Sequence, residues 1–185
     1  MDRLGAMRVV LFLPEDVQLL TGSPANRRRY MDITLCQIDP IYCRTLSNYN
    51  KVIEQRNATL RQLAEGERVR DVLPIYTEKL VELGSAIFLR RARFLENISR
   101  ETQRIHYESL TGGRESIKLL YLPRLGSKKS KLIPREEQSP IALAEWLESH
   151  QGQSELVSER FAKLWQESLA TAIARGVTTI GPHRD

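Results

Sequence analysis

The apolar positions of this chain recur every three or four residues over most of its length, which is the pattern of amphipathic helices. The pattern predicts one helix from about Ile41 to Ala64 and a longer one from about Pro74 to Glu108. Two such seams joined by a short polar link indicate an antiparallel helical hairpin. The seam residues are Leu46, Tyr49, Ile53, Arg56, Leu60 and Leu63 in the first helix, and Leu80, Gly84, Ile87, Arg91, Phe94 and Ile98 in the second.

Arginine occupies one seam position in each of these helices, Arg56 and Arg91. In one interpretation their stems lie at the edge of the core and their guanidinium groups reach water. In the other, they hold a carboxylate inside the helical lobe or at an interface. We expect the first arrangement.

Capping residues predict a helix before the hairpin. Ser23-Pro24 marks its start, because serine caps helix N-termini and proline fits the first helical turn. Its end is expected near Ile38, since the residue before Pro40 avoids helical angles. Arg28 and Asp32 are four residues apart in this helix, so they lie on one face within reach of each other.

Two more helices are expected after the hairpin. Ser139-Pro140 starts the first, which extends to about His150. The second extends from about Ser154 to Arg175, and Gly176 follows it as a C-cap.

Three short segments have the composition of strands, at 8–13, 116–122 and 177–180. The first is a continuous apolar run, which suggests a strand that is buried on both faces and needs partners. The chain is therefore expected to be α+β but mainly helical, with a helical lobe inserted between strands of a sheet that is mostly absent. The expected division is 1–23 for the edge of that sheet domain, 24–175 for the lobe with a basic loop at 124–140, and 176–185 for the return.

The net charge of +5 is concentrated in one part of the 185 residues. Residues 111–135 contain seven basic side chains and one acidic side chain, among them Lys128, Lys129 and Lys131. Such a patch can neutralise phosphates. A solvated loop whose charge only aids solubility is the equal alternative.

Several classes of protein are disfavoured by the sequence. No apolar run approaches the ~18 residues of a membrane span, so no membrane association is expected. The phosphate-loop, dinucleotide-binding, HExxH and GxSxG patterns do not occur. Cys36 and Cys43 lack the spacing of a zinc site, and we expect reduced thiols in a cytoplasmic protein. Aromatic residues make up only 6% of the chain, which argues against a nucleic-acid reader built on stacked rings.

One stretch of residues, 12–32, carries a specific resemblance. Its elements are Pro14-Glu15, Leu19-Leu20, Gly22-Ser23-Pro24, Arg27-Arg28 and Tyr30-Met31-Asp32, in this order and spacing. They closely resemble the signature of the RecF family. Further matches to the family are Tyr49 with Gln55-Arg56-Asn57, the seam of the long helix from Leu80 to Phe94, and the block of Gly176, Thr178 and 181–185 (Gly-Pro-His-Arg-Asp).

The resemblance implies the fold and cofactors of a longer protein. RecF proteins resemble the ABC and SMC ATPases, and this chain resembles their middle part, between the phosphate loop and the ABC signature with its Walker B acid. The resemblance implies ATP and Mg²⁺ as cofactors of the full-length protein, which is a weak ATPase. This chain alone is expected to bind neither tightly and to be inactive, with no catalytic or metal-binding residue of its own.

The resemblance also implies a role in DNA replication and recombinational repair, including gap repair and the SOS response. The expected partners are duplex DNA and junctions of single and double strands, RecO and RecR for RecA loading, and a second copy in an ATP-dependent homodimer. The alternatives are a non-enzymatic helical protein-interaction module and a basic-loop DNA-binding module without nucleotide dependence.

The same resemblance suggests two groups of site residues. The first is expected at the junction of lobe and ATPase head, and comprises Pro14, Glu15, Gly22, Pro24, Arg27, Arg28 and Asp32. The second is expected to contact DNA or a dimer partner, and comprises Lys128, Lys129, Lys131, His183 and Arg184.

Overall fold

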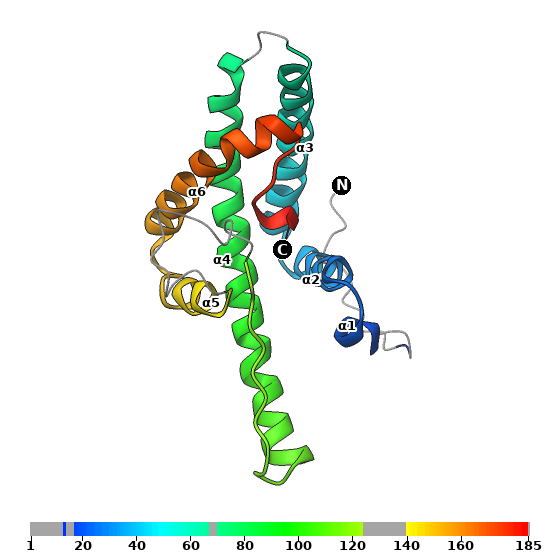
Figure 1. Ribbon diagram of the computed structural model, residues 1–185. Helices are drawn as coiled ribbons and strands as arrows, with labels where there is room; N and C mark the ends of the chain where they lie inside the picture. Colours follow the sequence, from blue (N-terminus) through cyan, green and yellow to red (C-terminus); the bar gives the residue numbers. More distant parts are fainter. Residues whose placement is uncertain (1–12, 14–16, 67–69, 124–139, 185) are drawn as a thin grey trace.

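The computed structural model describes residues 13, 17–66, 70–123 and 140–184, and these ranges are mainly helical, as the sequence predicts (Figure 1). No strand is found within them. The elements in chain order are α1 (Gln18–Thr21), α2 (Pro24–Ile38), α3 (Pro40–Ala64), the 3₁₀ turn η2 (Arg70–Val72), α4 (Leu73–Ile105), the π-helical turn η3 (His106–Leu110), α5 (Pro140–Ser149), α6 (Ser154–Arg175) and the 3₁₀ turn η5 (Pro182–Arg184).

The centre of the molecule is the antiparallel hairpin of α3 and α4, with α6 packed across both helices (Figure 1). Gly84 of α4 allows this crossing to be close, because a Cβ there would lie 2.5 Å from Cε1 of Phe161 in α6. The largest buried apolar side chains of this body are Tyr42, Tyr49, Leu80, Ile87, Phe88, Leu147, Phe161 and Trp165.

Local capping contacts explain where the helices begin and end. The Oγ of Ser23 accepts a hydrogen bond from the Asn26 N–H at 3.3 Å at the start of α2. Asp39 separates α2 from α3, and its carboxylate accepts from two N–H groups of the first turn of α3. Gly176 ends α6 in the left-handed conformation, with φ of 60°.

The C-terminal end of α4 projects from the body and forms, with η3 and the chain that returns along it, an arm (residues 99–119) (Figure 1). The expected strand at 116–122 is wrong, because this segment has irregular backbone and lies against a helix. Side chains of α4 replace a neighbouring strand as hydrogen-bond partners. Gln103 Oε1 accepts from the Ile117 N–H at 2.6 Å, and Ser99 Oγ accepts from the Leu119 N–H at 2.8 Å.

The other two expected strands have different outcomes. Residues 8–12 lie outside the described ranges, whereas residues 177–180 are described and have irregular backbone. A strand needs a paired neighbour, and the described part of the chain offers none to this segment. Among the described helices, none is both long and apolar enough to cross a bilayer.

Cys36 of α2 and Cys43 of α3 are both free and partly buried. Burial raises the pKa of the Cys36 thiol to about 12, and its hydrogen bond with Cys43 adds to the shift. Cys36 therefore remains a neutral thiol at physiological pH.

Candidate functional site

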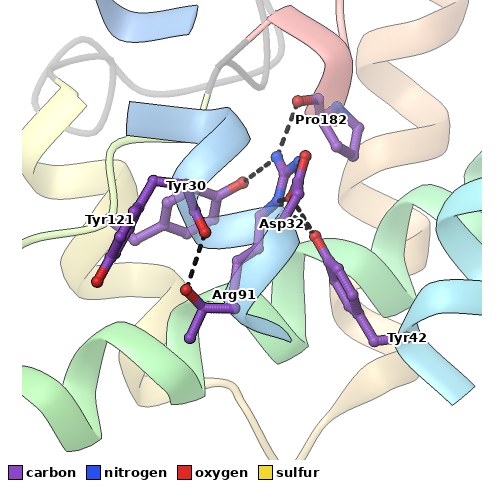
Figure 2. A network of polar contacts seen from close by, with 7 residues as sticks. Tyr30, Asp32, Tyr42, Arg91, Tyr121 and Pro182 are labelled. Atoms are coloured by element: carbon purple, nitrogen blue, oxygen red, sulfur yellow. Dashed lines mark hydrogen bonds and ion pairs between the residues drawn. The ribbon is translucent and has the colours of Figure 1, made fainter. Parts of the chain in front are cut away.

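The most extensive buried polar network surrounds Arg91 of α4, whose side chain is 1% exposed. Its Nη2 donates to both carboxylate oxygens of Asp32 in α2, at 2.8 and 3.0 Å (Figure 2). Its Nε donates to the hydroxyl of Tyr42 in α3 at 3.0 Å. The hydroxyl of Tyr42 in turn donates to Asp32, and burial raises the pKa of Tyr42, so this hydroxyl stays protonated.

The same guanidinium also reaches the C-terminal part of the chain. Its Nη1 donates to the backbone carbonyl of Pro182 at 2.8 Å and to the hydroxyl of Tyr121 at 3.4 Å (Figure 2). Arg91 of α4 therefore joins four other segments: the consecutive helices α2 and α3, the segment returning from the arm, and η5. Because a buried charge is costly unless paired and hydrogen-bonded, this network strongly determines how the segments meet.

A second arginine, Arg56 of α3, is fully buried beside this network. Its Nη1 donates to Thr178 Oγ1 at 2.8 Å, and its guanidinium lies 4.6 Å from the ring centroid of Trp165. Burial lowers the pKa of Arg56 to about 10, which keeps it charged at pH 7. The neighbouring Asn57 accepts a hydrogen bond from the Thr178 N–H at 2.8 Å, so α3 holds the segment after α6 from two adjacent residues.

These contacts overturn the expectation that Arg56 and Arg91 reach water from the edge of the core. Both are buried, and Arg91 holds a carboxylate inside the lobe, which is the other interpretation of the sequence pattern. Arg56 has no carboxylate partner among its hydrogen bonds in the described residues; the ring of Trp165 and a threonine hydroxyl surround it instead.

The C-terminal turn is fixed by His183 and Tyr49. The Tyr49 hydroxyl lies 2.9 Å from His183 Nδ1, and His183 Nε2 lies 3.5 Å from the carbonyl oxygen of Thr178. Burial lowers the pKa of His183 to about 4, and the charges of Arg184, Arg28 and Arg91 add to this effect. The neutral ring must carry its proton on Nε2, because a carbonyl only accepts; Nδ1 then accepts from Tyr49.

Gly181 makes the approach of this turn to Tyr49 feasible. Its φ of 117° is unfavourable for any residue with a side chain, and a Cβ would overlap the Tyr49 hydroxyl. Gly181 and His183 therefore allow the C-terminal turn to pack closely against Tyr49 of α3.

A polar cavity of about 510 Å³ lies beside this turn, between α2 and α6. Three arginines from separate elements line it: Arg28 of α2, Arg175 of α6 and Arg184 of η5. Glu167 is the acidic member of the lining. The other lining residues are Leu164, Ser168, Thr171, Thr179, Ile180 and His183. We refer to it as the basic cavity.

The residues predicted from the sequence are brought together only in part. Arg28, His183 and Arg184 line the basic cavity, although they come from the two suggested groups. Asp32 directs its carboxylate to Arg91 and Tyr42. The remaining predicted residues are placed as follows: Arg27 donates to the Gly22 carbonyl at 2.8 Å, Pro24 is the first residue of α2, and Pro14, Glu15, Lys128, Lys129 and Lys131 lie outside the described ranges.

Two residues of the site were not expected. The seam pattern placed Arg91 on the inner face of α4 but did not identify Asp32 as its partner. Nothing in the sequence distinguished Arg175 as a site residue, because a basic residue in the last turn of a helix is generally favoured there.

No protein-family model matches the chain, but individual relatives and solved structures do. DNA replication and repair protein RecF of Streptococcus uberis is 34% identical over 184 residues, which is 100% of this chain and 43% of the relative. The RecF protein of Geobacillus kaustophilus is 36% identical and covers 98% of this chain, again with 43% of the relative matched.

Two solved structures of the recombination mediator protein RecF in the RecFOR pathway have the same fold. The one described as RecF-ATP matches 99% of this chain with a TM-score of 0.79 and 27% identity, and the one described as RecF-ATPrS matches 98% with a TM-score of 0.78 and 28% identity. The match spans 43% and 42% of those chains. The chain thus spans less than half the length of the relatives it matches, and over its whole length it is similar to one part of RecF, which is named in those relatives as a DNA replication and repair protein.

Proposed function

We propose that this chain is the helical lobe of an ATP-dependent DNA-binding protein of recombinational repair, inserted between strands of an ABC-type ATPase head. The observation that supports this best is the Arg91 network, which holds α2 together with the turn at Pro182. An inserted lobe leaves and returns to its parent domain at one place, so its first and last elements lie together. The RecF-ATP description of a solved relative supports the nucleotide dependence of the whole protein.

In this proposal the lobe supplies shape and DNA contacts, and the head supplies the nucleotide chemistry. ATP and Mg²⁺ would be held by the phosphate loop and the acidic residues of the head, between two copies of the full-length protein. The dimer would act on duplex DNA near single-stranded gaps, with RecO and RecR, in the cytoplasm. Pro14, Glu15, Gly22, Pro24, Arg27, Arg28 and Asp32 would form the junction between lobe and head.

The DNA contacts proposed for the lobe come from the lysines at 128, 129 and 131 and from the C-terminal turn with His183 and Arg184. Lysines that neutralise phosphates release counterions, so the affinity must fall steeply with salt. Because 111–135 carries more than the whole net charge, its loss removes most of this electrostatic attraction.

Fluorescence anisotropy of a labelled gapped duplex, titrated with the 185-residue chain at several salt concentrations, tests the proposal. Replacement of Lys128, Lys129 and Lys131 by alanine is expected to reduce the salt slope by roughly one for each lost phosphate contact. The matched control replaces three other lysines of the chain, Lys51, Lys79 and Lys163, and is expected to keep the slope. Absence of binding at low salt would contradict a DNA role for the lobe.

A nucleotide titration tests the division of labour between lobe and head. The 185-residue chain is expected to show no tight ATP binding in equilibrium dialysis, with or without Mg²⁺. Tight binding of ATP by this chain alone would contradict the assignment of the nucleotide site to the head.

A further inference from the structure

We propose that the basic cavity binds a phosphate group of a nucleic acid strand, with Arg28, Arg175 and Arg184 as its ligands. The inference rests on the proposed function and deepens it, since it names a built site through which the lobe would hold DNA. The site is distinct from the lysine-rich segment, whose residues lie outside the described ranges.

The charge of the lining favours an anion. Arginines from α2, α6 and η5 line the cavity, and among the described lining residues Glu167 is the one with a carboxylate. With His183 neutral, the described residues of the lining carry an excess of two positive charges. Cations held together in this way repel one another, and an anion between them relieves the repulsion.

The uncharged groups of the wall favour phosphate within the class of anions. Three residues that carry hydroxyl groups, Ser168, Thr171 and Thr179, line the cavity together with the arginines. The hydroxyl of Ser168 donates to the Trp165 carbonyl at 2.9 Å and can still accept a hydrogen bond. A phosphate offers oxygens on several sides and so can use guanidinium forks and hydroxyls at once, whereas a carboxylate has only two oxygens. The volume of about 510 Å³ is within the range of small-molecule sites, which gives room for a nucleotide unit around the phosphate.

The construction of the site suits a ligand that arrives from solvent. Arg175 and Arg184 are exposed and Arg28 is partly buried, so at least two of the three cations are open to a ligand from solvent. The floor beside them is fixed, because Tyr49 and the Thr178 carbonyl hold the ring of His183. A wall that is already ordered lowers the cost of ordering the site when a ligand binds.

His183 provides an internal reporter of occupancy. The charged groups that face its ring are Arg28 from α2, Arg91 from α4 and Arg184 from η5, and Tyr49 faces it from α3. These positive charges help to lower its pKa, so an anion bound among them must raise it.

The test uses pyrophosphate as the probe and the 185-residue chain as the protein. Calorimetry is expected to detect binding, and the imidazole NMR signals of His183 are expected to show a raised pKa on saturation. The double variant R175Q/R184Q is expected to weaken binding at least tenfold. The matched control, R100Q/R104Q, removes two exposed arginines of the arm and is expected to bind like the unaltered chain, with circular dichroism confirming that both variants fold.

Three results would overturn the site: no pyrophosphate binding, binding that R175Q/R184Q leaves unchanged, or binding of citrate as tight as that of pyrophosphate. The last would assign the cavity to carboxylates of a protein partner. A further comparison measures binding of a short oligonucleotide that carries a 5′-phosphate and binding of ATP. Tight binding of ATP without binding of the oligonucleotide would contradict the proposal that the phosphate belongs to a nucleic acid. If the unaltered chain binds DNA but not pyrophosphate, this site is rejected while the proposed function of the lobe is still supported.

Discussion

The body and the arm of this lobe are stabilised in different ways. The body joins segments that are up to 134 residues apart through buried polar contacts, such as that between Tyr49 and His183. The arm is the end of one helix with a returning chain, and the ion pairs within its helix are local and exposed, as between Arg104 and Glu101, whose side chains are 56% and 63% exposed. One further pair, between Lys118 and Glu148 at 3.6 Å, connects the base of the arm to α5. Exposed pairs of this kind contribute little to stability, whereas breaking a buried pair is costly.

This difference indicates where a perturbation will be felt. Changes in the body should affect the whole fold and the placement of the C-terminal turn beside α2. Changes in the arm should remain local, because few contacts connect it to other elements.

Substitution of Asp32 by alanine should be the most damaging of these changes. It leaves the guanidinium of Arg91 buried without its carboxylate, which is expected to cost about 3 kcal/mol or more. Urea unfolding followed by circular dichroism measures the loss. The arm control Glu101→Ala, which breaks an exposed pair, should change the stability by less than about 0.5 kcal/mol. If the two substitutions lowered the free energy of unfolding equally, the contrast between buried pairs in the body and exposed pairs in the arm would be wrong.

The body should become less stable as the pH is lowered, because His183 resists protonation in the folded chain. The pKa of His183 is lowered to about 4 in the folded chain, from 6.5 in the unfolded one. Below pH 6.5 the unfolded chain therefore takes up a proton that the folded chain does not, and the stabilising contribution is lost as the pH falls toward 4. Relative to neutral and higher pH, the loss reaches about 2 kcal/mol at pH 5.

Comparison of the unaltered chain with His183→Gln isolates this effect. The variant is expected to be less stable at pH 7, since it loses contacts with Tyr49 or Thr178, but its stability should depend less on pH between 6.5 and 5. Parallel pH profiles of the two proteins in urea unfolding would show that His183 is not the titrating group.

Substitution of Gly84 by alanine should disturb the crossing of α4 and α6. The new Cβ would lie 2.5 Å from Phe161 Cε1 and 3.3 Å from Tyr49 Cε2, so the helices must move apart. We expect a net loss of about 1–2 kcal/mol in the free energy of unfolding, because overpacking outweighs the better helix propensity of alanine. Gly152→Ala is the control, since no atom lies within 4 Å of its Cβ; a similar loss there would contradict the packing argument.

Substitution of Arg104 by alanine should have the smallest effect. It removes exposed ion pairs with Glu101 and Glu108 on the arm, which are expected to contribute about 0.5 kcal/mol at most. The melting temperature should change by only a few degrees, and less at high salt. A loss comparable to that of Asp32→Ala would show that the arm is part of the cooperative core.

Local signals in the sequence were sufficient to predict where the helices lie. Ser23, Pro24 and Gly176 predict the ends of α2 and α6 because capping depends on one or two residues. The seam of alternating three- and four-residue steps predicts the hairpin for the same reason: periodicity is a property of one helix at a time.

The polar site could not be predicted in the same way, because its partners are distant in sequence. Spacing alone suggested Arg28 as a neighbour of Asp32, but 59 residues separate Asp32 from Arg91, which holds its carboxylate. Nor does a pattern distinguish a strand from an extended segment on a helix. Residues 116–122 have the composition of a strand, yet their hydrogen bonds go to side chains of Ser99 and Gln103.

Hydrogen exchange on the variant Arg91→Met tests most directly the claim that one buried guanidinium holds the first and last elements of the lobe together. Methionine fills similar apolar space but removes the bonds to both Asp32 and Pro182. We expect faster exchange in α2 and in residues 177–184 together, with the arm unchanged. Faster exchange in only one of these two segments, or an equal change in the arm, would contradict it.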